Sequence, residues 1–412
     1  MPSLKSTVSH PPVQYFSTEH LKNDLRYTSV KGGTITMLSQ AAKFGLRTCS
    51  TVVLARLLSP EDYGLFGMAA VVTGFVQIFK DLGLSSATIQ QAEINHKQVS
   101  TLFWINVALS ATITLLVVGI GPLTAWFYSE PRLIAITIAI SISFLFGGLT
   151  VQHQALLRRQ MRFNQLAIIE IISMAVGVLS SILAGLAGLG YWALVIWQVA
   201  QSMANAIAVW VVCDWRPGWP SAPKHVMPML NYGWNLTGFN CVNYFSRNFD
   251  NLLIGRMWGA QQLGLYSKAY QLLLLPIQQI NNPISGVAIP VLSRLQLDPA
   301  QYSNYYHKAI MAITLVGMPL VGFMFASADQ LIEVVLGSQW TEAALIFRLL
   351  APAAWIGTFN VATGWVYQTL GRTDRQLQWG VISSVINVFL ISISARWGAV
   401  GVAAAYGLTR PL

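Results

Sequence analysis

The segment RTCSTVVLARLLSPEDYGLFGMAA, residues 47–70, aligns without a gap to RNFDNLLIGRMWGAQQLGLYSKAY, residues 247–270. Several substitutions between the two segments are mild, such as Val for Leu, Leu for Ile, Leu for Met and Phe for Tyr. The identical positions pair Arg47 with Arg247, Arg56 with Arg256, Gly64 with Gly264, Leu65 with Leu265, and Ala69 with Ala269. Weaker similarities follow in the same order further along both parts. A fixed offset of this kind predicts two related halves that arose by duplication.

The composition predicts the environment of these halves. The chain has 412 residues, of which 54% are hydrophobic and only 10% charged, and its mean hydropathy is +0.53. A soluble domain carries about 25% charged residues. The composition therefore excludes a soluble enzyme, a disordered protein and a disulfide scaffold, and it predicts a polytopic membrane protein. Cys49, Cys213 and Cys241 lie in apolar stretches, and we expect them to be small buried side chains.

Apolar stretches recur along the chain at the length of about 20 residues that a membrane-spanning helix needs. They are Gly33–Leu57, Leu65–Phe79, Leu102–Phe127, Leu133–Gln152, Leu166–Gly188, Tyr191–Cys213, Trp234–Met257, Ala269–Leu292, Ala309–Ala326, Ala344–Leu370 and Leu377–Ala395. A twelfth begins near Gly398 and is too short to span securely, so either this helix is partial or the chain is truncated. The sequence predicts an all-α protein with about 11–12 transmembrane helices.

The basic residues explain the net charge of +10. One set of alternate loops holds Lys5, Lys22, Arg26, Lys31, Lys80, Lys97, Arg158, Arg159, Arg162, Arg216, Lys224, Arg294, Lys308, Arg372 and Arg375. The positive-inside rule places these loops, and the N-terminus, in the cytoplasm. No apolar core followed by a cleavage site precedes the first stretch, so we expect no cleaved signal peptide. Because the basic residues are spread over short loops, nucleic acid is not an expected partner.

The repeat and the loops together predict the organisation of the chain. We expect a cytoplasmic N-terminal segment at residues 1–32, a six-helix half at 33–215, a cytoplasmic linker at 216–228 and a second half at 229–412. The linker is rich in proline and polar residues. An even number of helices in each half keeps both halves in the same orientation. Such pseudo-symmetric halves enclose a central cavity and rock about it.

Charges inside the apolar stretches are the candidates for function, because each is costly in the membrane. Lys43 and Arg47 share one face of the first stretch, and Arg247 and Asp250 share one face of the seventh. The equivalent positions of Arg47 and Arg247 predict three cations around one cavity, which suits an anion and in particular a phosphate. Alternatively, Arg247 pairs internally with Asp250. Glu170, near the start of the fifth stretch, either pairs with a nearby arginine or takes part in proton coupling.

Other polar positions have structural interpretations. We expect Arg56 and Arg256, at the outer ends of their helices, to snorkel or to cap a helix C-terminus. Glu61 and Asp62 lie in an outer loop, where a membrane glycosyltransferase or polymerase would need acids. The repeat replaces this pair by Gln261 and Gln262, so a polar helix-entry turn explains it better. The histidines lack metal-ligand spacing and no phosphate-binding loop is present, so we expect no metal, no cofactor and no enzyme activity.

Several of these motifs carry a family resemblance. The segments are residues 54–67 (LARLLSPEDYGLFG), 83–87 (GLSSA), 156–163 (LLRRQMRF) and 250–256 (DNLLIGR). They resemble the bacterial polysaccharide transporters, which are the lipopolysaccharide, O-antigen and exopolysaccharide flippases of the multidrug/oligosaccharidyl-lipid/polysaccharide exporter superfamily. The resemblance covers the chain from about residue 25 onward.

This resemblance implies translocation of an undecaprenyl-diphosphate-linked oligosaccharide across the bacterial inner (plasma) membrane by alternating access. It implies that Lys43, Arg47 and Arg247 bind the diphosphate, since cationic cavity residues are similar to those of murein-precursor flippases. Asp250 and Glu170 are the candidates for H⁺ or Na⁺ coupling, and membrane lipids, a glycan polymerase and a chain-length regulator are candidate partners. The alternatives are a cation-coupled drug exporter of the same superfamily and, further away, a membrane glycosyltransferase or polymerase.

Overall fold

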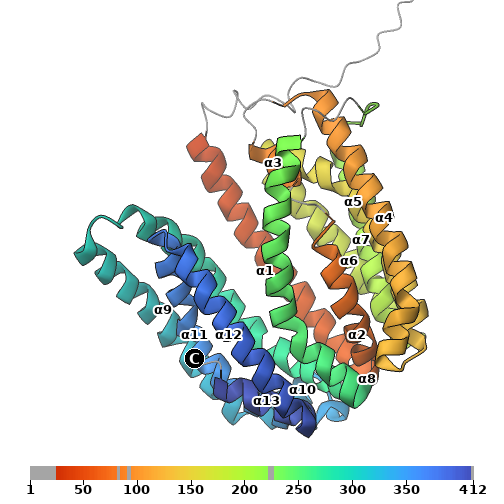
Figure 1. Ribbon diagram of the computed structural model, residues 1–412, viewed down its shortest axis with the longest axis vertical. Helices are drawn as coiled ribbons and strands as arrows, with labels where there is room; N and C mark the ends of the chain where they lie inside the picture. The colour runs from red at the N-terminus through yellow and green to blue at the C-terminus, as the bar shows by residue number, and fades with distance from the viewer. Residues whose placement is uncertain (1–24, 81–83, 91–93, 221–226, 410–412) are drawn as a thin grey trace, which may run out of the picture. The chain divides into compact units, whose positions relative to one another are not determined.

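The computed structural model describes residues 25–80, 84–90, 94–220 and 227–409, and most of these residues are helical (Figure 1). No strand occurs in these ranges. The α-helices are α1 (Leu25–Leu57), α2 (Pro60–Gln77), α3 (Leu84–Gln90), α4 (His96–Tyr128), α5 (Arg132–Arg159), α6 (Phe163–Leu186), α7 (Trp192–Val212), α8 (Met227–Arg294), α9 (Pro299–Ala326), α10 (Ala328–Val335), α11 (Ala343–Thr369), α12 (Thr373–Ser394) and α13 (Gly398–Thr409).

Seven helical segments of the described ranges are long and apolar enough to cross a membrane. They are His96–Tyr128, Arg132–Arg159, Phe163–Leu186, Trp192–Val212, Pro299–Ala326, Ala343–Thr369 and Asp374–Gly407. Because a water-soluble chain would not leave so many spanning-length apolar surfaces uncovered, the protein is an all-α polytopic membrane protein, as the composition predicts.

The other predicted spans fall in α1, α2 and α8; Lys43 and Arg47 lie in α1, and Arg247 and Asp250 lie in α8. The predicted spans Trp234–Met257 and Ala269–Leu292 are both part of α8, a single run of 68 residues. The run is interrupted at Gly259, whose φ of 77° and ψ of −174° are not helical. A positive φ is accessible to glycine at little cost, and Gly259 therefore separates the two predicted spans.

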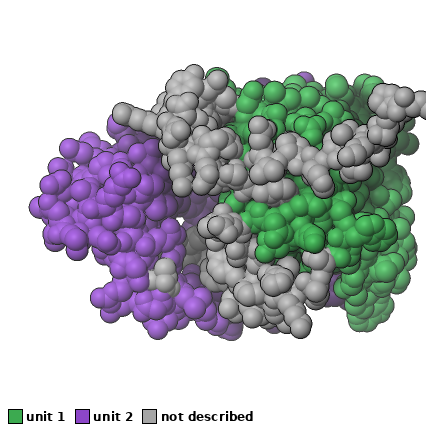
Figure 2. All heavy atoms as spheres, turned by 90° about the horizontal axis from the view of Figure 1, so that it is seen from above, with its two compact units in different colours: residues 1–54, 72–126, 130–243 green, residues 55–71, 127–129, 244–412 purple. Residues whose placement is uncertain are grey.

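The chain forms two compact units that do not divide it at a single point (Figure 2). Unit 1 comprises residues 1–54, 72–126 and 130–243, and unit 2 comprises residues 55–71, 127–129 and 244–412. The end of α1 and the first part of α2 thus belong to the same unit as the C-terminal helices. The predicted boundaries at 1–32, 33–215, 216–228 and 229–412 stay a prediction.

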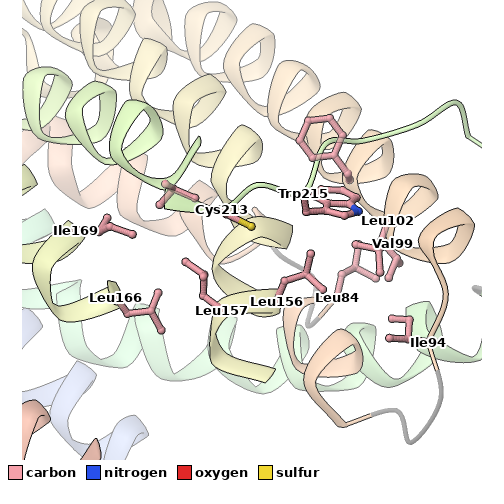
Figure 3. Close-up of a cluster of buried hydrophobic side chains, with 12 residues drawn as sticks. Leu84, Ile94, Val99, Leu102, Leu156, Leu157, Leu166, Ile169, Cys213 and Trp215 are labelled. Atoms are coloured by element: carbon pink, nitrogen blue, oxygen red, sulfur yellow. The ribbon is translucent and has the colours of Figure 1, made fainter. Parts of the chain in front are cut away.

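In unit 1, helix α7 packs against both α5 and α6. One buried cluster joins the ends of these helices to α3 and α4, and it includes Leu102, Leu157, Cys213 and Trp215 (Figure 3). Burying an apolar side chain of this size stabilises a fold by about 2 kcal/mol relative to exposing it to water. Cys213 is a small buried side chain as expected, whereas Cys49 is exposed, so the expectation for Cys49 is wrong. The side chain of Cys241 lies outside the described residues.

Unit 2 contains both copies of the repeated Gly-Leu pair, and the two copies touch. A side-chain carbon at Gly64 would overlap the backbone carbonyl of Ala260, and one at Gly264 would overlap the carbonyl of Pro60. Pro60 and Ala260 are themselves repeat counterparts. The contact is therefore reciprocal, as across a two-fold axis, and the glycines are required because they let two backbones approach closely.

The same corner is made in two ways in the two copies. In the first copy, Ser59 precedes α2, and the Asp62 carboxylate accepts hydrogen bonds from the Ser59 backbone N–H (2.9 Å) and hydroxyl (2.7 Å). The Asp62 N–H donates to the Ser59 hydroxyl at 3.2 Å, which completes a reciprocal cap. In the second copy the corresponding residue is Gly259, whose positive φ turns the chain.

Candidate functional site

The charged face of α1 lies in unit 1. The Lys43 ammonium is 2.5 Å from Oε2 of Glu170, which is carried by α6. The side chains retain 17% and 40% of their exposure, so the pair is partly open. The partner of the Glu170 carboxylate is therefore a lysine of α1, far away in the sequence, and not an arginine of the adjacent loop.

Arg47 lies one helical turn beyond Lys43 and is exposed. Within the described part of the chain its side chain makes no hydrogen bond or ion pair. Its backbone carbonyl also accepts a hydrogen bond from the Ser50 hydroxyl at 2.9 Å. The face of α1 therefore presents one neutralised cation and one open cation, a turn apart.

The corresponding region of α8 lies in unit 2. Arg247 is exposed, and its side chain has no hydrogen-bonding or ion-pairing partner among the residues that the structure describes. Asp250, three residues on, is 5% exposed. Its carboxylate accepts a hydrogen bond from the Tyr266 hydroxyl at 2.8 Å and one from the Asn251 backbone N–H at 2.7 Å.

Tyr266 is a functional candidate that the sequence alone does not single out. It is 1% exposed and stacks on Tyr270, whose hydroxyl lies 2.8 Å from the hydroxyl of Tyr406 on α13. The only available signal is that Tyr266 replaces Phe66 at the equivalent repeat position, which adds a hydroxyl where Asp250 adds a carboxylate. Hydroxyl donors of this kind stabilise a buried charge.

Arg56 and Arg256 both make contacts within unit 2. Arg56 donates a hydrogen bond of 2.6 Å to the Val334 carbonyl in the last turn of α10, so it caps a helix C-terminus, although not that of its own helix. Arg256 lies over the ring of Phe127, with 5.7 Å from the guanidinium carbon to the ring centroid. Both arginines therefore have structural roles, in agreement with the capping interpretation of Arg56.

In the acidic pair Glu61–Asp62, Asp62 has a structural role, because its carboxylate caps α2 through Ser59. Its engagement there disfavours the glycosyltransferase or polymerase alternative. Among the described residues, no group of three or more histidine, cysteine, aspartate or glutamate side chains could hold a metal ion. The predicted site residues all lie on α1, α6 and α8.

The structure brings some of these residues together. Lys43 and Glu170 are in contact, and Arg247 and Asp250 share one helix in unit 2. Lys43 and Arg47 belong to unit 1. The shared cavity for Lys43, Arg47 and Arg247 stays a prediction, as do the coupling roles of Asp250 and Glu170.

These features define a polytopic membrane protein with duplicated, charge-bearing helices, and comparison with known proteins places it in a family. Residues 53–345, more than half of the chain, match the family described as "Polysaccharide biosynthesis protein". The chain belongs to this family, which confirms the resemblance stated from the four sequence motifs.

Individual relatives agree with this family, and a solved structure shares the fold. The chain is 28% identical to the teichuronic acid biosynthesis protein TuaB of Bacillus subtilis over 92% of its own length and 77% of that protein. It is 23% identical to the lipopolysaccharide biosynthesis protein WzxC of Escherichia coli, again over 92% and 77%. A solved structure of the lipid II flippase MurJ, in an inward closed conformation, matches with a TM-score of 0.73 at 15% identity, over 92% of this chain and 85% of that chain. This likeness shows that the fold is shared.

Proposed function

We propose that this protein translocates an oligosaccharide linked to a polyprenyl diphosphate, such as undecaprenyl diphosphate, across the plasma membrane by alternating access. The substrate would serve the synthesis of a lipopolysaccharide or an exopolysaccharide. The biosynthetic names of TuaB and WzxC, and that of MurJ as a flippase of the same fold, support this proposal.

One observation carries the proposal. Arg47 and Arg247 are equivalent positions of the repeat, and both side chains are exposed and unpaired within the described residues. An arginine at the centre of a spanning helix costs about 2.5–3.5 kcal/mol on insertion scales. Two equivalent arginines that form no internal pair are therefore explained best by a ligand.

The chemistry of the guanidinium group favours a phosphate ligand. Its planar array of N–H donors matches two phosphate oxygens at once, and it stays charged at any physiological pH. A diphosphate cannot cross hydrocarbon unaided, so cations that hold it between the halves would lower the barrier while the lipid tail stays in the bilayer. The sugar chain would be carried in the aqueous part of the cavity.

The orientation follows from the loop charges. The basic loops would face the cytoplasm, and the N-terminus with them. The substrate would enter from the cytoplasmic leaflet, as the family resemblance implies. A glycan polymerase and a chain-length regulator would act on the product at the outer face. Asp250 and Glu170 are the candidates for coupling to H⁺ or Na⁺, because the sequence contains no nucleotide-binding loop.

Export in cells tests the proposal. Arg47→Ala and Arg247→Ala should each abolish polymer export at normal protein levels, and lipid-linked repeat units should accumulate in the cytoplasmic leaflet. Arg47→Lys keeps the charge but loses the bidentate geometry, so it should retain part of the export. Cys49→Ser is the matched control, because Cys49 is exposed on the same helix and uncharged. Normal export by both alanine variants would refute the assignment.

A further inference from the structure

The ion pair between Lys43 and Glu170 joins α1 to α6 inside unit 1. A lysine inside an apolar stretch is costly without a counter-charge, and Glu170 supplies that charge with its Oε2 at 2.5 Å. Glu170 keeps 40% of its side-chain exposure, so the carboxylate is not enclosed by protein. The pair is therefore held in a place that another anion can reach.

The neighbouring arginine makes Lys43 part of a larger anion site. Arg47 is four residues from Lys43 on α1, a spacing at which side chains emerge about 6 Å apart on one helix face. Arg47 is exposed and, among the described residues, unpaired. A ligand with two linked phosphates that contacts Arg47 would reach Lys43 with its second phosphate.

Glu170 and such a ligand would then compete for the same ammonium group. A diphosphate carries more negative charge than one carboxylate and offers more acceptor oxygens, so it can displace Glu170 while Arg47 holds its other end. When the diphosphate leaves, Glu170 can return to Lys43. In the absence of Glu170, the lysine would be unpaired between rounds of transport and would hold the ligand more tightly.

We propose that Glu170 is an internal substitute for the substrate diphosphate, which occupies Lys43 when the site is empty and is displaced on binding. The proposal rests on the function proposed above and adds a role for the helix α6 carboxylate. Its consequence is that Glu170 weakens binding and promotes release. Glu170 is a positioning residue, because it acts on the substrate through Lys43.

Binding to the purified full chain in detergent micelles tests this role, with inorganic pyrophosphate and undecaprenyl diphosphate as separate probes measured by calorimetry. Glu170→Gln removes the competing charge at constant shape. An ion pair of this exposure is worth up to about a fivefold change in affinity, so the variant should bind both probes about two- to fivefold more tightly. Polymer export by the same variant should fall, because release becomes slower.

A double variant distinguishes competition from a general effect on the fold. If Glu170 acts through Lys43, Glu170→Gln should produce no gain in affinity in a Lys43→Gln background. The matched control is the Asp329–Arg348 ion pair of unit 2, which is also partly exposed. Asp329→Asn should leave the affinity for pyrophosphate unchanged.

The outcomes separate this proposal from the function on which it rests. Equal or weaker binding by Glu170→Gln would overturn the competition, as would a gain that persists without Lys43. If Glu170→Gln does not fold, Glu170→Asp keeps a carboxylate on a shorter side chain, and an unchanged affinity in that variant would overturn the proposal.

If Arg47→Ala and Arg247→Ala bind pyrophosphate as well as the parent chain does, the proposed function itself fails, whatever Glu170 does. Tighter binding of pyrophosphate but not of the lipid would limit the role to free diphosphate and would also contradict the proposal.

Discussion

Residues 47–70 and 247–270 can be compared position by position, and their backbones behave alike. Both segments leave the helix at the same place, at Ser59 in the first copy and at Gly259 in the second. One turn later each presents a glycine, Gly64 or Gly264, to the backbone of the other copy. The reciprocal contact lies within unit 2.

The charges of the two copies behave differently. Four residues before the first copy, Lys43 takes its counter-charge from another helix, through Glu170. In the second, the position equivalent to Lys43 is Asn243, and the acid Asp250 occupies the position of Ser50. Ser50 and Asp250 are both buried, and Tyr266 supplies the donor that the carboxylate needs.

This difference shows which features of two duplicated segments can change in one copy without a change in the other. A contact between two backbones depends on both copies at once, because a side chain on either glycine disturbs the shared contact. A charge can be exchanged in one copy if a partner is available nearby, from α6 in one case and from α8 itself in the other. The arginine occurs in both copies, as Arg47 and Arg247, and neither side chain pairs within the described residues.

The largest loss of stability is expected at the contact that Gly64 and Gly264 make. Gly64→Ala and Gly264→Ala should each destabilise the protein by about 3 kcal/mol, because overpacking against backbone cannot be relieved by rotating a side chain. Thermal unfolding of the purified protein in detergent measures this loss. Gly286→Ala is the control, since Gly286 lies in α8 with open space around its Cα, and alanine there should be neutral or stabilising by up to about 1 kcal/mol. Similar stability of all three variants would show that the reciprocal contact is not tight.

An intermediate effect is expected at the buried position that differs between the copies. Tyr266→Phe removes the donor to the Asp250 carboxylate and should cost about 2 kcal/mol, because hydrogen bonds to charged groups are strong. Ser50→Ala removes a neutral hydrogen bond to the Arg47 carbonyl and should cost about 1 kcal/mol or less. Unfolding of the two variants under identical conditions gives the ratio of their losses in the free energy of unfolding. Equal losses would mean that Asp250 draws little stabilisation from Tyr266.

The smallest effect is expected at the corner itself. Asp62→Ala removes the reciprocal cap with Ser59 and should cost about 1 kcal/mol. The counterpart Gln262→Ala should change stability by less than about 0.5 kcal/mol, because the second copy turns at Gly259 instead. Polymer export should persist in Asp62→Ala, and its loss at normal protein levels would revive a role for the outer acids.

Much of this organisation is predictable from the amino-acid sequence. The scarcity of charge predicts a membrane protein, and a repeat at a fixed offset predicts which residues are equivalent. The cap at Ser59 and Asp62 is also predictable, because it involves neighbours in the chain. The exposure of Cys49 is not, because an apolar stretch does not reveal which side of its helix is covered.

By itself, the sequence determined the class of the protein, the equivalence of Arg47 and Arg247, and the short set of intramembrane charges, because composition and spacing are local properties of a chain. Only the tertiary structure decided the partners: Glu170 for Lys43, Tyr266 for Asp250, and Pro60 and Ala260 for the two glycines. Such pairings depend on how each helix is rotated and packed against a distant one, and periodicity along the chain carries no information about that rotation.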